Sequence, residues 1–282
     1  MASTSRRAEA PQTRFIANAR MYAVAPEAEA AWQALIAQVA EEAEVALDYV
    51  PHPAPRPLED LWRRADLGCV QMCGYPIALG LAQVVPIAAP IPALGWAEGR
   101  AAYRSDLIVR ADSPFRSLED SFGHRLGWTV GHSHSGFNAL RHHLLPHWQA
   151  RGGPLYAEVK GDLVTARRIL DSVLDGSIDI GPLDAYWHAL IARYRPDLTA
   201  GIRVLASTAL APMPAFVAAP GLPVEAVARL RQAFAAAASR PWFAPQAQAL
   251  LIAGFAPVDL TSFATTLAWD HEAVAAGYAS PG

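Results

Sequence analysis

The chain has 282 residues, of which 52% are apolar, and its formal net charge is −3 at pH 7. This length provides one large domain or two medium-sized domains with substantial cores. The slightly negative charge supplies no basic field for a polyanion, so nucleic-acid binding is excluded as the main function.

The N-terminal residues contain no recognisable targeting sequence. Arg6 and Arg7 are not followed by the apolar core, roughly 7–15 residues long, of a secretory signal. We therefore expect residues 1–13 to form a disordered tail.

The first third of the chain alternates strands and helices. Strands are predicted over residues 14–19, 45–50 and 67–72, and helices over residues 27–43 and 58–64. The longer helix is indicated by apolar residues three and four positions apart, namely Trp32, Leu35, Ile36 and Val39. A loop with four prolines, residues 51–57, separates the second strand from the short helix. This alternation predicts an α/β fold with a parallel sheet and helices on both faces.

The two cysteines, Cys69 and Cys73, fall at and just after the third strand. On one strand their side chains would share a face but lie roughly 13 Å apart. That separation is too large for a disulfide, so we expect two buried free thiols. A two-cysteine metal site is the weaker alternative.

Residues 74–97 contain no charged side chain, but they include four prolines. Prolines at that density do not fit an unbroken membrane-spanning helix. We expect a short buried helix near residues 77–81, then a strand and a proline-rich crossing, and no membrane span.

The segment Gly131-His132-Ser133-His134-Ser135-Gly136-Phe137 lies between a predicted strand, residues 125–130, and a predicted helix, residues 138–145. Backbone N–H groups, serine hydroxyls and the positive end of the helix dipole would meet there, which suits an anion. Glycine at 136 allows the backbone to approach a bound group closely. The alternative is that the serines only cap the helix.

The second half of the chain continues the alternation. Helices are predicted over residues 161–174, 185–195, 223–237, 241–251 and 262–276, and strands over residues 179–181 and 202–207. Ser117 indicates a further helix start, because Glu119 and Asp120 place negative charge in its first turn.

These motifs, in their order and spacing, resemble the periplasmic phosphate- and phosphonate-binding proteins of ABC transporters. Residues 133–136 match the Ser-x-Ser-Gly loop of that family, and residues 103–109 and 113–120 also match. A second family pattern is matched by Gly176, Asp179, Gly181, Asp184 and Trp187. The resemblance covers about residues 14–255.

The resemblance implies a type II periplasmic-binding-protein-like fold, in which the ligand lies in a cleft between two α/β lobes. Two crossing strands, near residues 105–109 and 204–208, would join the lobes. Lobe one would comprise residues 14–106 and 207–282, and lobe two residues 107–206.

The resemblance also implies ligand contacts. Ser133, Ser135 and Gly136 would hold the anion, and His134 stands where the family often has threonine. Asp184 would meet the rest of the ligand, unless it only caps the helix that follows.

Tyr22 and Tyr75 would supply cleft aromatics, with ordinary packing as the alternative. A histidine common in the family has no counterpart in residues 159–166, where Lys160 is the cationic residue. A small ligand other than phosphonate is therefore an alternative.

Other functional sites are less well supported. His143 and His147 have a spacing suited to a metal, but Pro146 between them would kink or end the helix. We expect no metal and no cofactor. Residues 131–135 resemble the nucleophile motif Gly-x-Ser-x-Gly, but serine replaces its last glycine.

We therefore predict a monomeric solute-binding protein rather than an enzyme, with a small anionic ligand and an ABC transporter permease as partners. Its predicted location is periplasmic by family resemblance, although no signal peptide is visible. The alternative is a cytoplasmic enzyme or ligand sensor on the same two-lobe scaffold.

Overall fold

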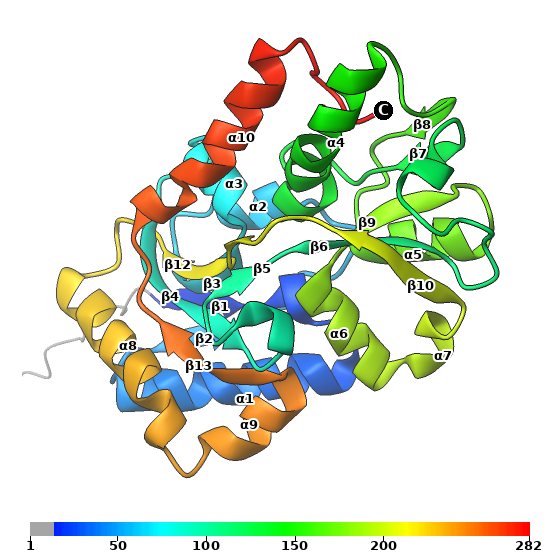
Figure 1. The fold of residues 1–282 in the computed structure, drawn as a ribbon. Coiled ribbons are helices and arrows are strands. Elements are labelled where there is room, and N and C mark those ends of the chain that lie inside the picture. Colours follow the sequence, from blue (N-terminus) through cyan, green and yellow to red (C-terminus); the bar gives the residue numbers. More distant parts are fainter. Residues whose placement is uncertain (1–13) are drawn as a thin grey trace, which may run out of the picture.

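The computed structural model describes residues 14–282, and the predicted tail at residues 1–13 lies outside the described residues. The chain forms two larger sheets covered by helices (Figure 1). The first sheet has the strand order β13 (Ile252–Ala256), β4 (Val85–Pro92), β12 (Ala215–Ala218), β3 (Leu67–Met72), β1 (Phe15–Asn18) and β2 (Leu47–Tyr49). Strands β1, β2 and β3 pair in parallel, and β12, β4 and β13 join antiparallel.

The second sheet has the order β10 (Ile202–Ser207), β6 (Ser105–Arg110), β9 (Ile180–Asp184), β7 (Arg125–Gly127) and β8 (Glu158–Lys160). A small ribbon of β11 (Ala211–Pro212) and β5 (Ala102–Tyr103) lies beside the point where the chain passes between the sheets. We call the first sheet with its helices lobe one and the second sheet with its helices lobe two. This mixed α/β architecture confirms the predicted fold class.

Lobe one is covered by α1 (Pro26–Glu42), α2 (Leu58–Trp62), α3 (Gly74–Ala78), α8 (Val224–Ala236) and α9 (Phe243–Leu250). The predicted apolar face of α1 is buried and includes Trp32, Leu35, Ile36 and Val39. Helix α1 packs against α8 and α9 beneath the sheet (Figure 1). Val224 at the start of α8 is 73% exposed, because the buried face of that helix begins at Ala226.

Lobe two carries α4 (Ala139–Arg151), α5 (Ala166–Leu174), α6 (Ala185–Tyr194) and α7 (Pro196–Thr199). Helix α4 continues through Pro146 to Arg151. The prediction that the helix ends at residue 145 was therefore wrong. Proline removes one backbone donor, but buried Leu144 and Leu145 hold the turn in the core. Helix α5 begins later than predicted, because Thr165 caps it by accepting a hydrogen bond from the Arg168 N–H over 3.1 Å.

The remaining regular segments are short. The 3-10 helices are η1 (Arg20–Tyr22), η2 (Gly95–Ala97), η3 (Glu119–Ser121), η5 (Ala237–Ser239) and η6 (Leu260–Phe263), and η4 (His134–Asn138) is a π-helical turn. Strands β12 and β13 were not predicted, since both are short and apolar without clear alternation.

The two crossing segments are hydrogen-bonded to each other where they leave lobe two. The Ser105 N–H donates to Thr208 Oγ1, and the Thr208 N–H donates to the Ser105 carbonyl, both over 2.9 Å. Strand β6 pairs antiparallel with β10. The crossings therefore act as one paired connection rather than as two independent strands.

The C-terminal helix α10 (Ala264–Ala275) forms another contact between the lobes. It packs against α3 of lobe one and α4 of lobe two, and the C-terminal end lies beside α4 (Figure 1). Ala273 and Tyr278, which the predicted division assigns to lobe one, belong to the core of lobe two. Tyr278 stacks on Trp148 of α4, with ring centroids 5.0 Å apart. The division into two rigid lobes, with boundaries at residues 106–107 and 206–207, stays a prediction.

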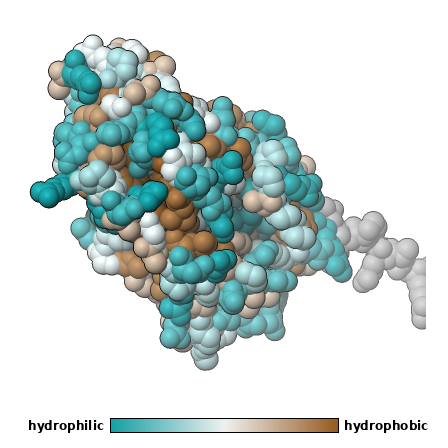
Figure 2. All heavy atoms as spheres, turned by 90° about the vertical axis from the view of Figure 1, so that its right-hand side faces the viewer, coloured by the Kyte–Doolittle hydropathy of each residue, from teal (hydrophilic) through white to brown (hydrophobic). Residues whose placement is uncertain are grey.

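Cys69 and Cys73 are both buried and free, which confirms the prediction for the thiols. Within residues 14–282, no helix combines the length and apolar character that crossing a bilayer requires. On the face shown in Figure 2, apolar surface gathers near the middle and hydrophilic side chains surround it.

Candidate functional site

The predicted anion loop begins at a capped helix end in lobe two. Ser133 has extended backbone angles, and its Oγ accepts a hydrogen bond from the Gly136 N–H over 3.0 Å. The π-helical turn η4 then leads directly into α4. A Cβ at position 136 would lie 1.9 Å from Thr129 Oγ1, so only glycine fits there. The close approach that Gly136 permits is thus to Thr129 within the protein.

His134 points away from solvent and into lobe one. It is 1% exposed and is surrounded by aromatic rings, with centroids 6.3 Å from Tyr75, 5.9 Å from Tyr103 and 5.3 Å from Trp269. Its Nδ1 lies 3.3 Å from Asn138 Nδ2, and its Nε2 has no partner within residues 14–282. Burial lowers the pKa of His134 to about 3, so the ring is neutral at pH 7.

Asp184 and Tyr22 meet at the boundary between the lobes. Asp184 Oδ1 accepts hydrogen bonds from the Tyr186 N–H (2.9 Å) and the Trp187 N–H (3.0 Å), which confirms that it caps α6. Its Oδ2 accepts a hydrogen bond from the Tyr22 hydroxyl over 2.9 Å. Burial raises the pKa of Asp184 to about 6, and these hydrogen bonds only partly offset that effect.

Tyr75 belongs to a polar network that links α3, α4 and α10. Its hydroxyl donates to Asp270 Oδ1 over 2.9 Å, and Arg141 donates to the same oxygen. Arg141, which is 3% exposed, also donates to the Ala279 carbonyl over 2.9 Å and to Asn138 Oδ1 over 3.1 Å. This network connects lobe one to lobe two through the C-terminal helix.

Of the seven predicted site residues, the structure brings two pairs together, Tyr22 with Asp184 and Tyr75 with His134. Ser133 and Ser135 are only partly buried. The Ser135 carbonyl accepts a hydrogen bond from Ser105 Oγ over 2.8 Å, which fastens the loop to the crossing strand β6. The loop is therefore held from both lobe two and the crossing.

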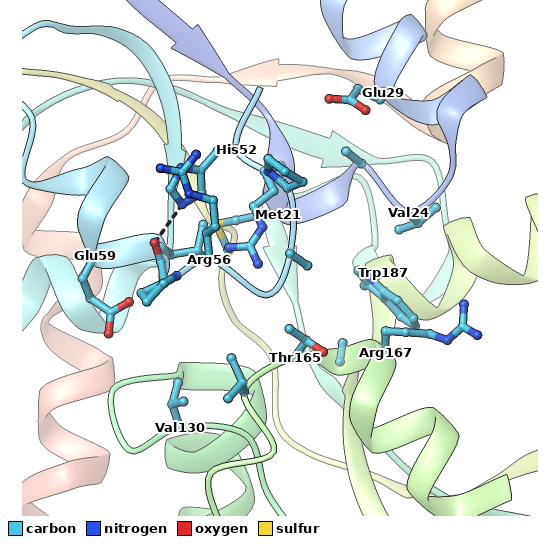
Figure 3. A pocket seen from close by; sticks show the side chains of 18 of the residues that line it. Met21, Val24, Glu29, His52, Arg56, Glu59, Val130, Thr165, Arg167 and Trp187 are labelled. Atoms are coloured by element: carbon cyan, nitrogen blue, oxygen red, sulfur yellow. Dashed lines mark hydrogen bonds between the residues drawn. The ribbon is translucent and has the colours of Figure 1, made fainter. Parts of the chain in front are cut away.

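A cleft of about 580 Å³ opens next to this loop, between the two lobes (Figure 3). Lobe one contributes η1 and the proline-rich loop at residues 51–57 together with the start of α2. Lobe two contributes Val130 and His132, which directly precede the predicted anion loop at residues 133–136, the start of α5, and Trp187 and Ile191 of α6. None of the seven predicted site residues lines this cleft. Tyr22 and Ser133 are next in sequence to lining residues, and Asp184 accepts a hydrogen bond from the N–H of Trp187, which lines it.

The charged residues of the cleft come from separate elements. Three arginines line it, Arg20 of η1, Arg56 of the proline-rich loop and Arg167 of α5. Two carboxylates also line it, Glu29 and Glu59. His132 Nε2 lies 3.1 Å from Glu59 Oε1, which connects the loop of lobe two to α2 of lobe one.

Sequence reasoning did not select these arginines. Arg20 stands two residues before Tyr22, in the segment that follows the first strand, and that position could have drawn attention to it. Arg56 lies in a loop that was predicted only as a loop. Lys160, the predicted substitute for the missing histidine, does not line the cleft, and its Nζ lies 3.7 Å from Glu158 Oε1.

His142 and His147 lie near separate carboxylates rather than around one point. His147 Nδ1 lies 3.6 Å from Glu119 Oε1, and His142 Nε2 lies 3.3 Å from Glu272 Oε2. In the described part of the chain, no three His, Cys, Asp or Glu side chains gather in a way that could hold a metal ion.

The sequence of the chain matches a family. Residues 22–263 match the family described as "ABC transporter, phosphonate, periplasmic substrate-binding protein". That match covers far more than half of the chain. A comparison with curated protein sequences gave no significant match.

Solved structures share the fold. A binding protein component of an ABC phosphonate transporter from Pseudomonas aeruginosa has a TM-score of 0.76 at 14% identity, over 91% of this chain and 85% of that one. PhnD1 from Prochlorococcus marinus in complex with methylphosphonate gives 0.74 at 13% identity, over 92% and 98%. A Xanthomonas citri protein bound to ATP gives 0.65 at 20% identity, over 94% and 99%. At these identities the likeness concerns the fold.

Proposed function

The chain belongs to the family of periplasmic phosphonate-binding proteins of ABC transporters, and on that premise we propose that it captures a small oxyanion in the cleft between its lobes. The closed form would then be recognised by a membrane permease. Members of this family are solute-binding proteins, so the chain would perform no chemistry on its ligand. The matched family gives no support to a cytoplasmic enzyme or sensor.

The observation that carries the proposal is the cleft with arginines from both lobes. Arg20 and Arg56 come from lobe one, and Arg167 comes from lobe two. A ligand that contacts both sides gains these contacts only when the lobes approach each other. Binding would therefore shift the population toward the closed form. An anion is favoured because the arginines outnumber the two carboxylates, one of which lies beside His132.

Ser133 and Ser135 do not line the cleft, but Ser133 directly follows His132 of its wall, and we propose that both serines contact the oxyanion at the edge of the cleft. The cap bond uses a lone pair of Ser133 Oγ and leaves its hydroxyl hydrogen free to donate. The start of the helix that follows adds favourable charge. Within the loop, Gly136 would act by allowing the tight turn and His134 by fastening the loop to the aromatic residues of lobe one.

Tyr22, Asp184 and Tyr75 are proposed to support the site rather than to touch the anion. The Tyr22–Asp184 hydrogen bond joins the lobes behind the cleft wall formed by Trp187. Tyr75 reaches α10 through Asp270. We propose that the protein is a monomer that acts in the periplasm.

The test is calorimetric titration with methylphosphonate, inorganic phosphate and sulfate, followed by recovery of each compound. Saturable binding with unchanged compound supports the proposal. Conversion of a compound during incubation, or binding of none of these and of no larger oxyanion, would contradict it.

A further inference from the structure

The cleft is larger and more apolar than a bare oxyanion requires. We propose that it takes an organic phosphonate or phosphate with an apolar body of about aryl size, and that Arg20 and Arg56 hold the anionic group. This inference rests on the proposed function and specifies the class of ligand. It also adds Arg20 and Arg56 to the loop at residues 133–136 as groups that contact the same anionic group.

The cleft is larger than a bare oxyanion. Its volume is about 580 Å³, and a water molecule occupies roughly 30 Å³ of liquid, so about twenty waters would fill it. A phosphate or methylphosphonate ion replaces only a few of them. Clefts of about 300–1,000 Å³ are usual for ligands the size of a metabolite or drug. The remaining volume leaves room for a larger ligand body.

The wall of the cleft suits an apolar ligand body. Apart from its charged residues, the cleft is lined mainly by apolar side chains, among them Met21, Val24, Val130, Trp187 and Ile191. Trp187 lies beside Arg167, on the opposite side of the view from His52 and Arg56 (Figure 3). An aryl group on this wall would remove apolar area from water, which stabilises the complex. A bare oxyanion would leave the wall in contact with water.

One arginine of the cleft has no partner in the described part of the chain. The Arg20 side chain is half-buried at the cleft, and no hydrogen bond or ion pair joins its guanidinium to a residue within 14–282. Burial lowers the pKa of Arg20, and the nearby charge of Glu59 partly offsets this. The guanidinium donors are therefore available for charge-assisted hydrogen bonds to an acceptor in the cleft. An anionic ligand group would supply that acceptor.

The other two arginines complete the charge pattern. Arg56 is exposed on the proline-rich loop and has no ion pair with a residue of the described chain. Arg167 uses its Nε for Asp171 Oδ1 at 2.8 Å, which leaves its terminal nitrogens for other partners. Arginine binds tetrahedral oxyanions through two parallel hydrogen bonds. Arg20 and Arg56, both from lobe one, are therefore the proposed anion holders, and Arg167 would approach on closure.

The test compares four probes by calorimetry on the full chain: phenylphosphonate, phenyl phosphate, methylphosphonate and neutral dimethyl phenylphosphonate. The variants are Arg20→Gln and Arg56→Gln. The control is Arg63→Gln, an exposed arginine that follows α2 and does not line the cleft. Because Arg20 is half-buried, thermal unfolding checks its variant, and exposed Arg56 carries the test if Arg20→Gln does not fold.

We expect the unmodified protein to bind phenylphosphonate and phenyl phosphate at least about tenfold more tightly than methylphosphonate. Arg56→Gln and Arg20→Gln should each weaken phenylphosphonate binding by about tenfold or more, and Arg63→Gln should not change it. Equal or tighter binding of methylphosphonate, unaffected by Arg56→Gln, would overturn this inference and leave the proposed function standing. Equal binding of the neutral ester, or binding of no probe, would contradict both.

Discussion

The hydroxyl of Tyr22 donates a hydrogen bond to Asp184 Oδ2 over 2.9 Å, although the two residues are 162 positions apart in the chain. Tyr22 belongs to lobe one and Asp184 begins helix α6 of lobe two. The same carboxylate therefore caps a helix and joins the lobes. Because the pair is buried, its protonation state affects the stability of this contact between the lobes.

Asp184→Asn should change how stability depends on pH. Burial holds the pKa of Asp184 near 6, above the usual 3.8, so the folded protein binds a proton more readily than the unfolded chain between those values. This carboxyl therefore stabilises the fold at low pH, and the contribution is lost as the pH rises through about 6. Asparagine keeps a cap acceptor but does not titrate. The melting temperature of the variant, relative to the unmodified protein, should rise between pH 4 and pH 7, and a constant difference would argue against the shifted pKa.

His134→Gln should have the opposite pH dependence. Burial lowers the pKa of His134 to about 3 from the usual 6.5, so the unfolded chain binds a proton that the folded protein lacks between those values. This histidine therefore destabilises the fold increasingly as the pH falls below about 6.5. Glutamine removes that effect while keeping an acceptor for Asn138. We expect melting curves of the variant to show less loss of stability between pH 7 and pH 4.

The control for His134 is His271→Gln, an exposed histidine on α10. Its melting temperatures should follow those of the unmodified protein at every pH. If both variants flatten the acid dependence equally, the burial of His134 is not its cause.

Replacing both Ser133 and Ser135 with alanine should weaken binding of the oxyanion. The two hydroxyls are proposed to donate hydrogen bonds to a charged acceptor, each worth roughly 1.5–3 kcal/mol. Affinity for phenylphosphonate should fall by at least about tenfold in calorimetry. The double variant also loses the Ser133 cap, which costs about 1 kcal/mol of stability, so its folding must be checked at the titration temperature.

A matched control for the loop is Ser117→Ala, which removes a serine outside the cleft that accepts a hydrogen bond from the Asp120 N–H. It should leave affinity unchanged. Unaltered binding in the Ser133 and Ser135 double variant, with the fold intact, would exclude these hydroxyls as ligand contacts.

Asp270→Ala should destabilise the protein strongly. Asp270 accepts hydrogen bonds from Tyr75 of lobe one and from Arg141 of lobe two, and its loss leaves the buried Arg141 charge without its carboxylate. Removing one partner of a buried ion pair costs about 3–5 kcal/mol. Denaturant titration measures the change. The exposed pair Arg195–Asp197 is the control, because solvent screens this pair and Asp197→Ala should leave the stability nearly unchanged. Similar small losses in both variants would show that the network contributes little.

Ligand binding should reduce the radius of gyration measured by small-angle scattering. The two crossing segments, joined at Ser105 and Thr208, are the proposed hinge, because a few residues there can change their dihedral angles while each lobe stays rigid. Opening would also separate Tyr22 from Asp184 and strain the contacts of α10. If scattering is unchanged at saturating phenylphosphonate and a ligand-free crystal is closed, the hinge mechanism is wrong for this protein.

The features that the sequence predicted well are local. The apolar face of α1, the strand β3 and the cap at Asp184 depend on residues a few positions apart, and their periodicity or capping preference shows directly in the chain. Where local patterns conflict, the observed ends of helices differ from the predicted ones. Helix α4 passes through Pro146 because buried neighbours compensate for the missing hydrogen bond.

The chain order and the family motifs thus determined the α/β class and the position of the loop at residues 133–136 before a helix. Only the tertiary structure decided that His134 turns into the aromatic residues of lobe one, and that Arg20, Arg56 and Arg167 meet around one cleft. Their convergence depends on how the lobes pack and on the C-terminal helix that contacts both. Such contacts join residues far apart in sequence, and no local periodicity or spacing encodes them.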